Sequence, residues 1–166
     1  LGDVYKRQVE DLRPNIYDPV EGTTIADAEV ERLPRKTKLV DVRWTCEDGT
    51  DLVISTTRPE LICACGVVVV HPDDERYRHL VGQRITLPLP TEGRSTTVEI
   101  QQHPSVKSEF GTGVLMVCSF GDQNDVAVFR ELGLAPFQAI DLNGTMTEVA
   151  GPVSYTHLTL PTTGSV

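Results

Sequence analysis

Two short polar segments carry side chains that could act on a substrate. The first is Thr56-Thr57-Arg58, where two hydroxyl groups precede a guanidinium group. Hydroxyls can hydrogen-bond an ester or a ribose, and the rigid fork of Arg58 suits a phosphate or a carboxylate. In the structural alternative, the threonines simply favour a strand and Arg58 pairs with Glu60. The residues alone leave both interpretations open.

The second segment carries two carboxylates, Asp122 and Asp125. An acid at the end of a strand can point into a cleft, where it would bind a small cationic group. In the structural alternative, Asp122 caps a helix and Asp125 stabilises its first turn, contributing about 0.5–2 and 0.3–1 kcal/mol respectively. The two interpretations are compatible, because a first-turn carboxylate can also face a cleft.

The pattern around these carboxylates predicts the elements that position them. Gly111 and Gly113 flank Thr112, so the backbone there can bend sharply or approach a ligand closely. Residues 114–117 are a short apolar run, which is typical of a buried strand. A helix is expected to begin at Asp122, with an apolar stripe and a terminating glycine: Val126, Phe129, Leu132 and Gly133. The prediction is a strand, a polar elbow and a helix.

Much of the remaining chain is expected to form short strands. The pattern of apolar residues predicts strands over 38–45, 52–56, 67–70, 85–87 and 97–100. Asp48-Gly49 supplies the turn of a hairpin between the first two, and Pro59 would end the second strand and open a helix. The all-valine run 67–70 implies burial on both faces. We therefore predict a mixed α/β fold, a β-barrel-like mixed sheet with peripheral helices.

The two polar segments also resemble the motifs of a known family. Ser55-Thr56-Thr57-Arg58-Pro59-Glu60-Leu61 is similar to a T-T-R-P-E signature, and residues 109–125 resemble a G-T-G…D-x-x-D segment. Both motifs belong to the editing domain inserted in the class I aminoacyl-tRNA synthetases for valine, isoleucine and leucine. The run 116–122 looks most like the archaeal type of the valine enzymes. Bacterial relatives carry lysine and threonine where Met116 and Cys118 stand, so no role is carried over for that lysine.

The resemblance implies a barrel-like fold and hydrolysis of the ester of mischarged Thr-tRNA(Val). It implies catalytic roles for Thr56, Thr57 and Asp122. It implies substrate binding by Arg58, by Gly111, Thr112 and Gly113, and by Asp125, which would accept the α-ammonium group. The implied partners are the 3′ end of tRNA(Val), the threonyl or valyl moiety and the catalytic domain of the parent synthetase. Editing itself is expected to need no metal or other cofactor, whereas the parent enzyme would use ATP and Mg.

Two alternatives to this function stay open. The equivalent domain of an isoleucyl- or leucyl-tRNA synthetase would act on another substrate by the same chemistry, although the run 116–122 favours the valine enzyme. A non-catalytic module would bind the tRNA end without hydrolysis. The sequence shows no Ser-His-Asp set. An aminoacyl ester is already labile, so orienting a water and stabilising the oxyanion would suffice.

The chain is expected to divide into four segments. Residues 1–8 and 153–166 fall outside the resemblance and read like translated sequencing adapter, so we expect both to be non-native tails. Residues 9–30 resemble a connector arm from the parent synthetase and are expected to be extended. Residues 31–152 are expected to form the editing domain, truncated at its C-terminal end.

Composition limits the classes of partner. The formal net charge is −9, the wrong sign for a broad tRNA-binding surface, so a nucleic-acid contact should be small and local or supplied by other domains. The chain has no apolar run of about eighteen residues, so no membrane partner is expected. The histidines at 71, 79 and 103 are expected in turn or surface roles. Buried reduced thiols, which fit a cytoplasmic location, are expected at Cys46, Cys63, Cys65 and Cys118.

Overall fold

The computed structural model describes residues 14–31, 33–34, 36–89 and 95–150. The strands are β1 (Ile16–Asp18), β2 (Thr23–Ile25), β3 (Val40–Cys46), β4 (Asp51–Thr56), β5 (Cys65–Val70), β6 (Arg84–Pro88), β7 (Ser95–Gln102) and β8 (Val114–Cys118). One α-helix, α1 (Gln123–Glu131), is accompanied by the 3-10 helices η2 (Asp27–Glu29), η3 (Pro59–Ala64), η4 (Arg78–Leu80) and η5 (Glu148–Ala150).

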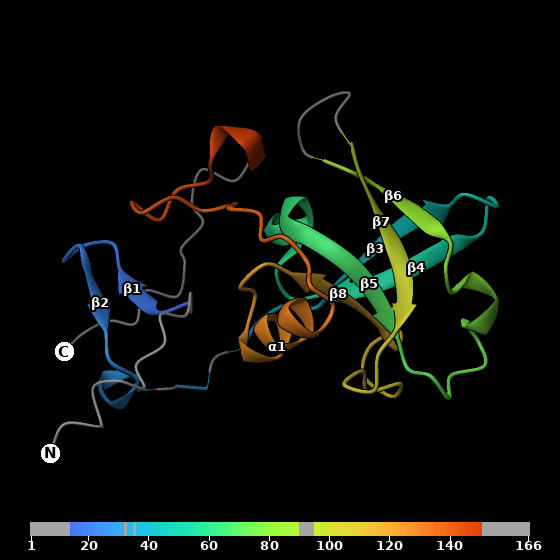
Figure 1. Cartoon of the computed structure of the whole chain (residues 1–166), viewed down its shortest axis with the longest axis horizontal. Coiled ribbons are helices and arrows are strands. Elements are labelled where there is room, and N and C mark those ends of the chain that lie inside the picture. The colour runs from blue at the N-terminus through green and yellow to red at the C-terminus, as the bar shows by residue number, and fades with distance from the viewer. Residues whose placement is uncertain (1–13, 32, 35, 90–94, 151–166) are drawn as a thin grey trace, which may run out of the picture.

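Six of the strands form one curled sheet with the order β4-β3-β6-β7-β5-β8. The two end strands, β4 and β8, lie beside each other, so the sheet is a nearly closed barrel (Figure 1). β5 and β7 run parallel, whereas β3–β4, β3–β6, β6–β7 and β5–β8 are antiparallel. The predicted mixed, barrel-like sheet with peripheral helices is confirmed. Closure matters for the site because it brings the end of β4 next to β8.

The hairpin β3–β4 forms where the alternating pattern predicts it. Gly49 has a φ of 84°, a conformation that glycine adopts without steric cost in the connecting turn. Alternate side chains of the two strands fill the barrel: Trp44, Cys46, Leu52 and Ile54 are all buried. This register ends β4 at Thr56, and Pro59 then opens η3 as its first residue.

Strand β5, between β7 and β8, is buried on both faces, as its valine run predicts. Its four valines, residues 67–70, are at most 1% exposed. Val68 and Val70 belong to the barrel interior, whereas Val67 and Val69 belong to a second core beneath α1. The position that a Cβ on Gly66 would take lies 2.5 Å from the ring of Phe129, so α1 packs directly on the backbone of β5.

Helix α1 begins and ends where the sequence predicts, but its buried stripe differs. Asp122 is the N-cap, and Gly133 follows the helix with a φ of 63°. Val128 and Phe129 are buried, whereas Val126 is only half-buried. Phe129 and Leu132 of the predicted apolar stripe pack in the core beneath α1, and Val128 rather than Val126 joins them, because the valines of β5 and β8 contact the face of α1 that carries Val128.

Residues 16–25 of the expected connector arm form a small hairpin rather than an extended segment. β1 and β2 pair antiparallel, from Ile16 opposite Ile25 to Asp18 opposite Thr23. Figure 1 shows this hairpin to one side of the barrel. The predicted non-native tails, 1–8 and 153–166, lie outside the described residues. None of the helices in the described part of the chain has the length and apolar character needed to span a membrane.

Candidate active site

The elbow between β8 and α1 holds the two predicted carboxylates in different ways. Asp122 Oδ1 accepts the backbone N–H of Asp125 at 2.8 Å, so Asp122 caps the helix. Asp125 Oδ2 accepts the backbone N–H of Cys118 at 3.2 Å. The Asp125 carboxylate also lies against Gly121, where a Cβ would overlap it. Asp122 is exposed, whereas Asp125 is 9% exposed. Of these two carboxylates, Asp125 is therefore the largely desolvated one.

Burial raises the pKa of Asp125 to about 6, and the negative charge of Asp122 acts in the same direction. The N–H of Cys118 and the positive charge of Arg58 oppose this rise in pKa. Asp125 is therefore ionised at neutral pH although its surroundings disfavour the charge. A cationic group bound beside it would relieve that cost, which makes Asp125 suited to accept an ammonium group.

The Thr56-Thr57-Arg58 segment ends β4 and joins it to the elbow. Thr56 Oγ1 accepts the backbone N–H of Arg58 at 3.1 Å, while Thr57 is exposed. Arg58 Nη1 donates to the carbonyl of Gly121 at 3.0 Å, across 63 residues of chain. Arg58 Nε also lies 3.6 Å from Glu60 Oε1, so the pairing expected in the structural alternative is present. The structure thus brings Arg58 to the elbow, while Thr56 and Thr57 directly precede it at the end of β4.

Gly111, Thr112 and Gly113 lie at the other end of β8, before Val114, so this strand separates them from the elbow. At roughly 3.3 Å per residue, five residues of strand span about 13–17 Å. The turn nevertheless packs on β4: Gly111 has a φ of 58°, and its Cβ position would be 2.8 Å from that of Ser55. The 111–113 turn therefore contacts Ser55 within β4, whereas the elbow contacts Arg58 just after β4.

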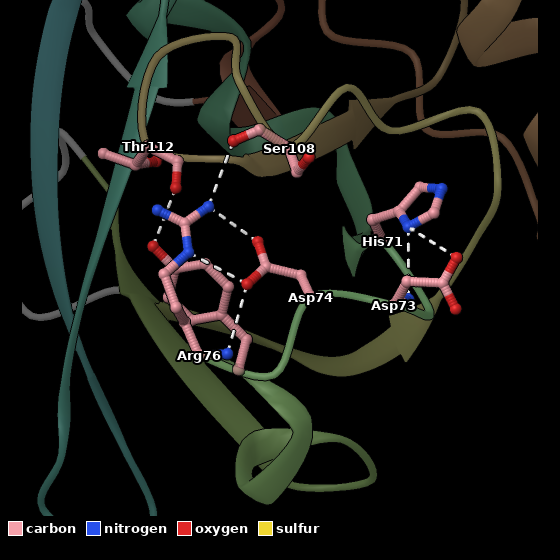
Figure 2. A network of polar contacts seen from close by, with 7 residues as sticks. His71, Asp73, Asp74, Arg76, Ser108 and Thr112 are labelled. Atoms are coloured by element: carbon pink, nitrogen blue, oxygen red, sulfur yellow. Dashed lines mark hydrogen bonds and ion pairs between the residues drawn. The ribbon is translucent and has the colours of Figure 1, made fainter.

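A polar network that the sequence analysis missed holds the 111–113 turn (Figure 2). Arg76 makes two bonds to the carboxylate of Asp74, at 2.9 and 2.6 Å, and donates to the carbonyl of Ser108 at 3.0 Å. The hydroxyl of Tyr77 donates to the carbonyl of Thr112 at 2.7 Å. The paired guanidinium keeps the pKa of Asp74 below its usual value. The loop before η4 is therefore a brace for the 111–113 turn.

The comparison with known proteins identifies the family. No protein-family model matches the chain. The valine–tRNA ligase of Aeropyrum pernix is 43% identical over 155 residues, which cover 92% of this chain and 18% of that protein. The enzyme of Nanoarchaeum equitans is 44% identical over 135 residues, covering 81% and 17%, and that of Methanopyrus kandleri is 47% identical over 134 residues, covering 78% and 15%. The chain belongs to the valine–tRNA ligase family. It spans less than a fifth of the length of these curated relatives.

This member of the valine–tRNA ligase family has a cavity beside Arg58 of about 490 Å³, which the sequence did not predict. Its walls are mostly apolar and come from η3, the elbow and the segment after α1: Arg58, Leu61, Ser119, Phe120, Pro136, Phe137, Gln138, Ala139 and Ile140. Ser119 Oγ accepts the backbone N–H of Phe137 at 2.7 Å and so holds the outer wall. A second, polar hollow of about 470 Å³ lies beside the brace and includes Asp74, Arg76 and Gly111.

The cysteines and one histidine have structural environments. All four cysteines are free and buried, as predicted. Burial raises the pKa of the Cys65 thiol to about 12, which makes it a poor nucleophile at neutral pH. His103 is 6% exposed and bonds Ser105 and Glu131. Its carbonyl accepts the N–H of Val106, so of the expected turn or surface roles this histidine has the turn role. Among the described residues, no group of three or more acidic, histidine or cysteine side chains is arranged to hold a metal ion.

Proposed function

We propose that the chain is the editing domain of a valine–tRNA ligase and hydrolyses the ester of mischarged Thr-tRNA(Val). Family membership supports the parent enzyme. The observation that carries the proposal is the 3.0 Å bond from Arg58 Nη1 to the carbonyl of Gly121. This contact joins the elbow that carries a desolvated carboxylate to Arg58, which directly follows the two hydroxyl residues Thr56 and Thr57. An aminoacyl ester offers an ammonium group next to the ester, so a carboxylate and nearby hydrogen-bonding groups suit its hydrolysis.

The proposed roles follow from the position of each group. Asp125 accepts the α-ammonium group, while the hydroxyls of Thr56 and Thr57 bind the ester and the ribose. Asp122 caps α1 and shapes the mouth of the site. Arg58 and the backbone of Gly111, Thr112 and Gly113 bind the 3′ end of the tRNA on the two sides of the β4 end.

In the reaction, the oxygen of a water attacks the ester carbonyl carbon. The bond from this carbon to the ribose oxygen breaks, and a proton originating from the water passes to that oxygen. The products are free threonine and uncharged tRNA. Orientation of the water and stabilisation of the oxyanion account for catalysis, so we propose that no metal or redox cofactor takes part.

The proposal also explains why a second site would be needed. A valine-shaped pocket rejects threonine by only about a hundredfold, because the two side chains have nearly the same volume. A site that hydrogen-bonds the threonine hydroxyl can reject valine far more strongly, since valine leaves the polar groups of the site without partners. Specificity would then reside in the polar lining of this domain.

Deacylation assays on the 166-residue chain test the proposal. We expect release of threonine from Thr-tRNA(Val) well above the spontaneous rate and no acceleration for Val-tRNA(Val). Asp27→Asn, an exposed acid in η2, is the matched control for charge removal and should deacylate at the parent rate. A folded chain that binds Thr-tRNA(Val) without accelerating its hydrolysis would instead be a non-catalytic module. Hydrolysis of Ile- or Val-charged tRNA in place of Thr-tRNA(Val) would contradict the assigned substrate.

A further inference from the structure

The side chain of Arg58 contacts Gly121 and Glu60, and Gly121 in turn lies against the carboxylate of Asp125. The residue lies directly before η3, and its guanidinium crosses to the elbow, where Nη1 bonds Gly121. The second contact, from Nε to Glu60, keeps the guanidinium close to the surface of η3. The Arg58 side chain is 39% exposed and that of Glu60 is 17% exposed. Arg58 therefore bridges two segments that are distant in sequence.

Arg58 reaches the Asp125 carboxylate through Gly121, and that carboxylate also accepts the N–H of Cys118. Gly121 contacts the Asp125 carboxylate so closely that a Cβ would overlap it. A displacement of the Gly121 backbone would therefore displace the carboxylate or expose it to water. The helix side of Asp125 is fixed separately, by the bond of its N–H to Asp122.

Arg58 is also the positive charge among the groups that face Asp125. Four charged or titratable groups surround it: Arg58 directly before η3, Cys65 in β5, Cys118 in β8 and Asp122 directly before α1. The two thiols are neutral at physiological pH because burial raises the pKa of both. Asp122 repels the Asp125 carboxylate, and Arg58 attracts it. Without Arg58, burial and Asp122 would act on Asp125 with only the Cys118 N–H in opposition.

We propose that Arg58 is a positioning residue, which fixes the elbow through Gly121 and keeps Asp125 ionised for binding the α-ammonium group. It would thus act on the substrate through Asp125, in addition to or in place of any direct contact with the tRNA end. The catalytic consequence rests on the proposed editing function. The effect on Asp125 does not, since it is a property of the free protein.

The first experiment follows the Asp125 carboxyl by carbon NMR through a pH titration of the full chain. Arg58→Gln keeps an N–H donor near Gly121 but removes the charge. We expect it to raise the pKa of Asp125 by up to about 1 unit, because the guanidinium is partly exposed and acts on this carboxyl less strongly than burial does. Arg58→Lys keeps the charge and should leave the titration close to that of the parent. The matched control is Arg43→Gln, which removes an exposed arginine of β3 that pairs with Asp51 of β4.

The second experiment measures deacylation of Thr-tRNA(Val) by the same variants between pH 5.5 and 8, a range set around the Asp125 pKa of about 6. Arg58→Gln should move the acid limb of kcat to higher pH, with a larger loss at low pH than at pH 8. An unchanged Asp125 titration in Arg58→Gln overturns the inference whatever the editing assay shows. A raised KM with an unchanged pH profile would make Arg58 a direct tRNA contact. Loss of the fold in both Arg58 variants would make it a structural residue, and this result also overturns the inference. A shifted titration in a chain that edits nothing would count against the proposed function alone.

Discussion

Replacing Asp125 by asparagine should stabilise the protein and remove its proposed activity. Asparagine is nearly isosteric, and its carbonyl oxygen can still accept the N–H of Cys118. The folded-state pKa of Asp125 is about 6 against an ordinary 3.8, so the folded protein binds more protons between these values. The free energy of unfolding contributed by this group therefore falls as pH rises from about 4 to about 6, and it stays lower above that range. The full shift corresponds to about 3 kcal/mol, and relaxation around the charge reduces the expected gain to about 1–2 kcal/mol.

Calorimetry and deacylation assays measure the two effects of Asp125→Asn. For a chain of this size, 1–2 kcal/mol raises Tm by about 2–8 °C at pH 7.5, and the gain should vanish near pH 4. Loss of a charge-assisted bond worth about 1.5–3 kcal/mol should slow deacylation of Thr-tRNA(Val) by roughly ten- to a hundredfold. If Asp125 only steadied the helix, the variant would lose about 0.3–1 kcal/mol and keep its activity. That pair of results would refute both the electrostatic argument and the site.

Three further predictions follow from the same contacts. Deacylation should decline as pH falls through about 6, because protonated Asp125 no longer attracts an ammonium group; a profile of kcat/KM that stays flat from pH 5.5 to 8 would contradict this. Tyr77→Phe removes the 2.7 Å bond to the carbonyl of Thr112. This change should lower the free energy of unfolding in denaturant by about 0.5–1.5 kcal/mol and reduce deacylation several-fold. Unchanged deacylation would show that the 111–113 turn does not bind substrate. Treatment with EDTA should leave the deacylation rate unchanged, and a loss restored by added Mg²⁺ would show that a metal takes part.

Local patterns predicted the elements of this fold because short-range physics decides them. The valine run of β5 is buried on both faces, and the Gly49 turn and Pro59 lie where the chain changes direction. The start of α1 was also predictable, since Asp122 is a good N-cap wherever a helix follows. The buried face of α1 was harder to predict, because the valines of β5 and β8 determine which of Val126 and Val128 is buried.

The contacts that assemble the candidate site are long-range, and no local pattern encodes them. Arg58 bonds Gly121 across 63 residues, Tyr77 bonds Thr112 across 35, and Arg76 bonds Ser108 across 32. Arg58 meets Gly121 where β4 and β8 come together at the ends of the sheet order. Tyr77 and Arg76 follow β5, and they meet the segment before β8 because β5 pairs with β8. The sequence offered Thr56, Thr57, Arg58 and Asp125 as candidates through their chemistry. It gave no signal for Tyr77 or Arg76, whose roles depend on where the 111–113 turn lies.

The different contacts of the two carboxylates favour a binding role for Asp125. Both interpretations of the sequence assigned Asp122 and Asp125 to the helix start, where either could satisfy a free backbone N–H. In the structure, Asp122 does so, and its bond to the Asp125 N–H meets the need of the helix. The Asp125 carboxylate turns to Cys118 instead, in an environment that raises its pKa and so costs stability at neutral pH. A capping role gains nothing from a buried charge, whereas binding a cation does, because low solvent exposure strengthens the attraction to an incoming ammonium group.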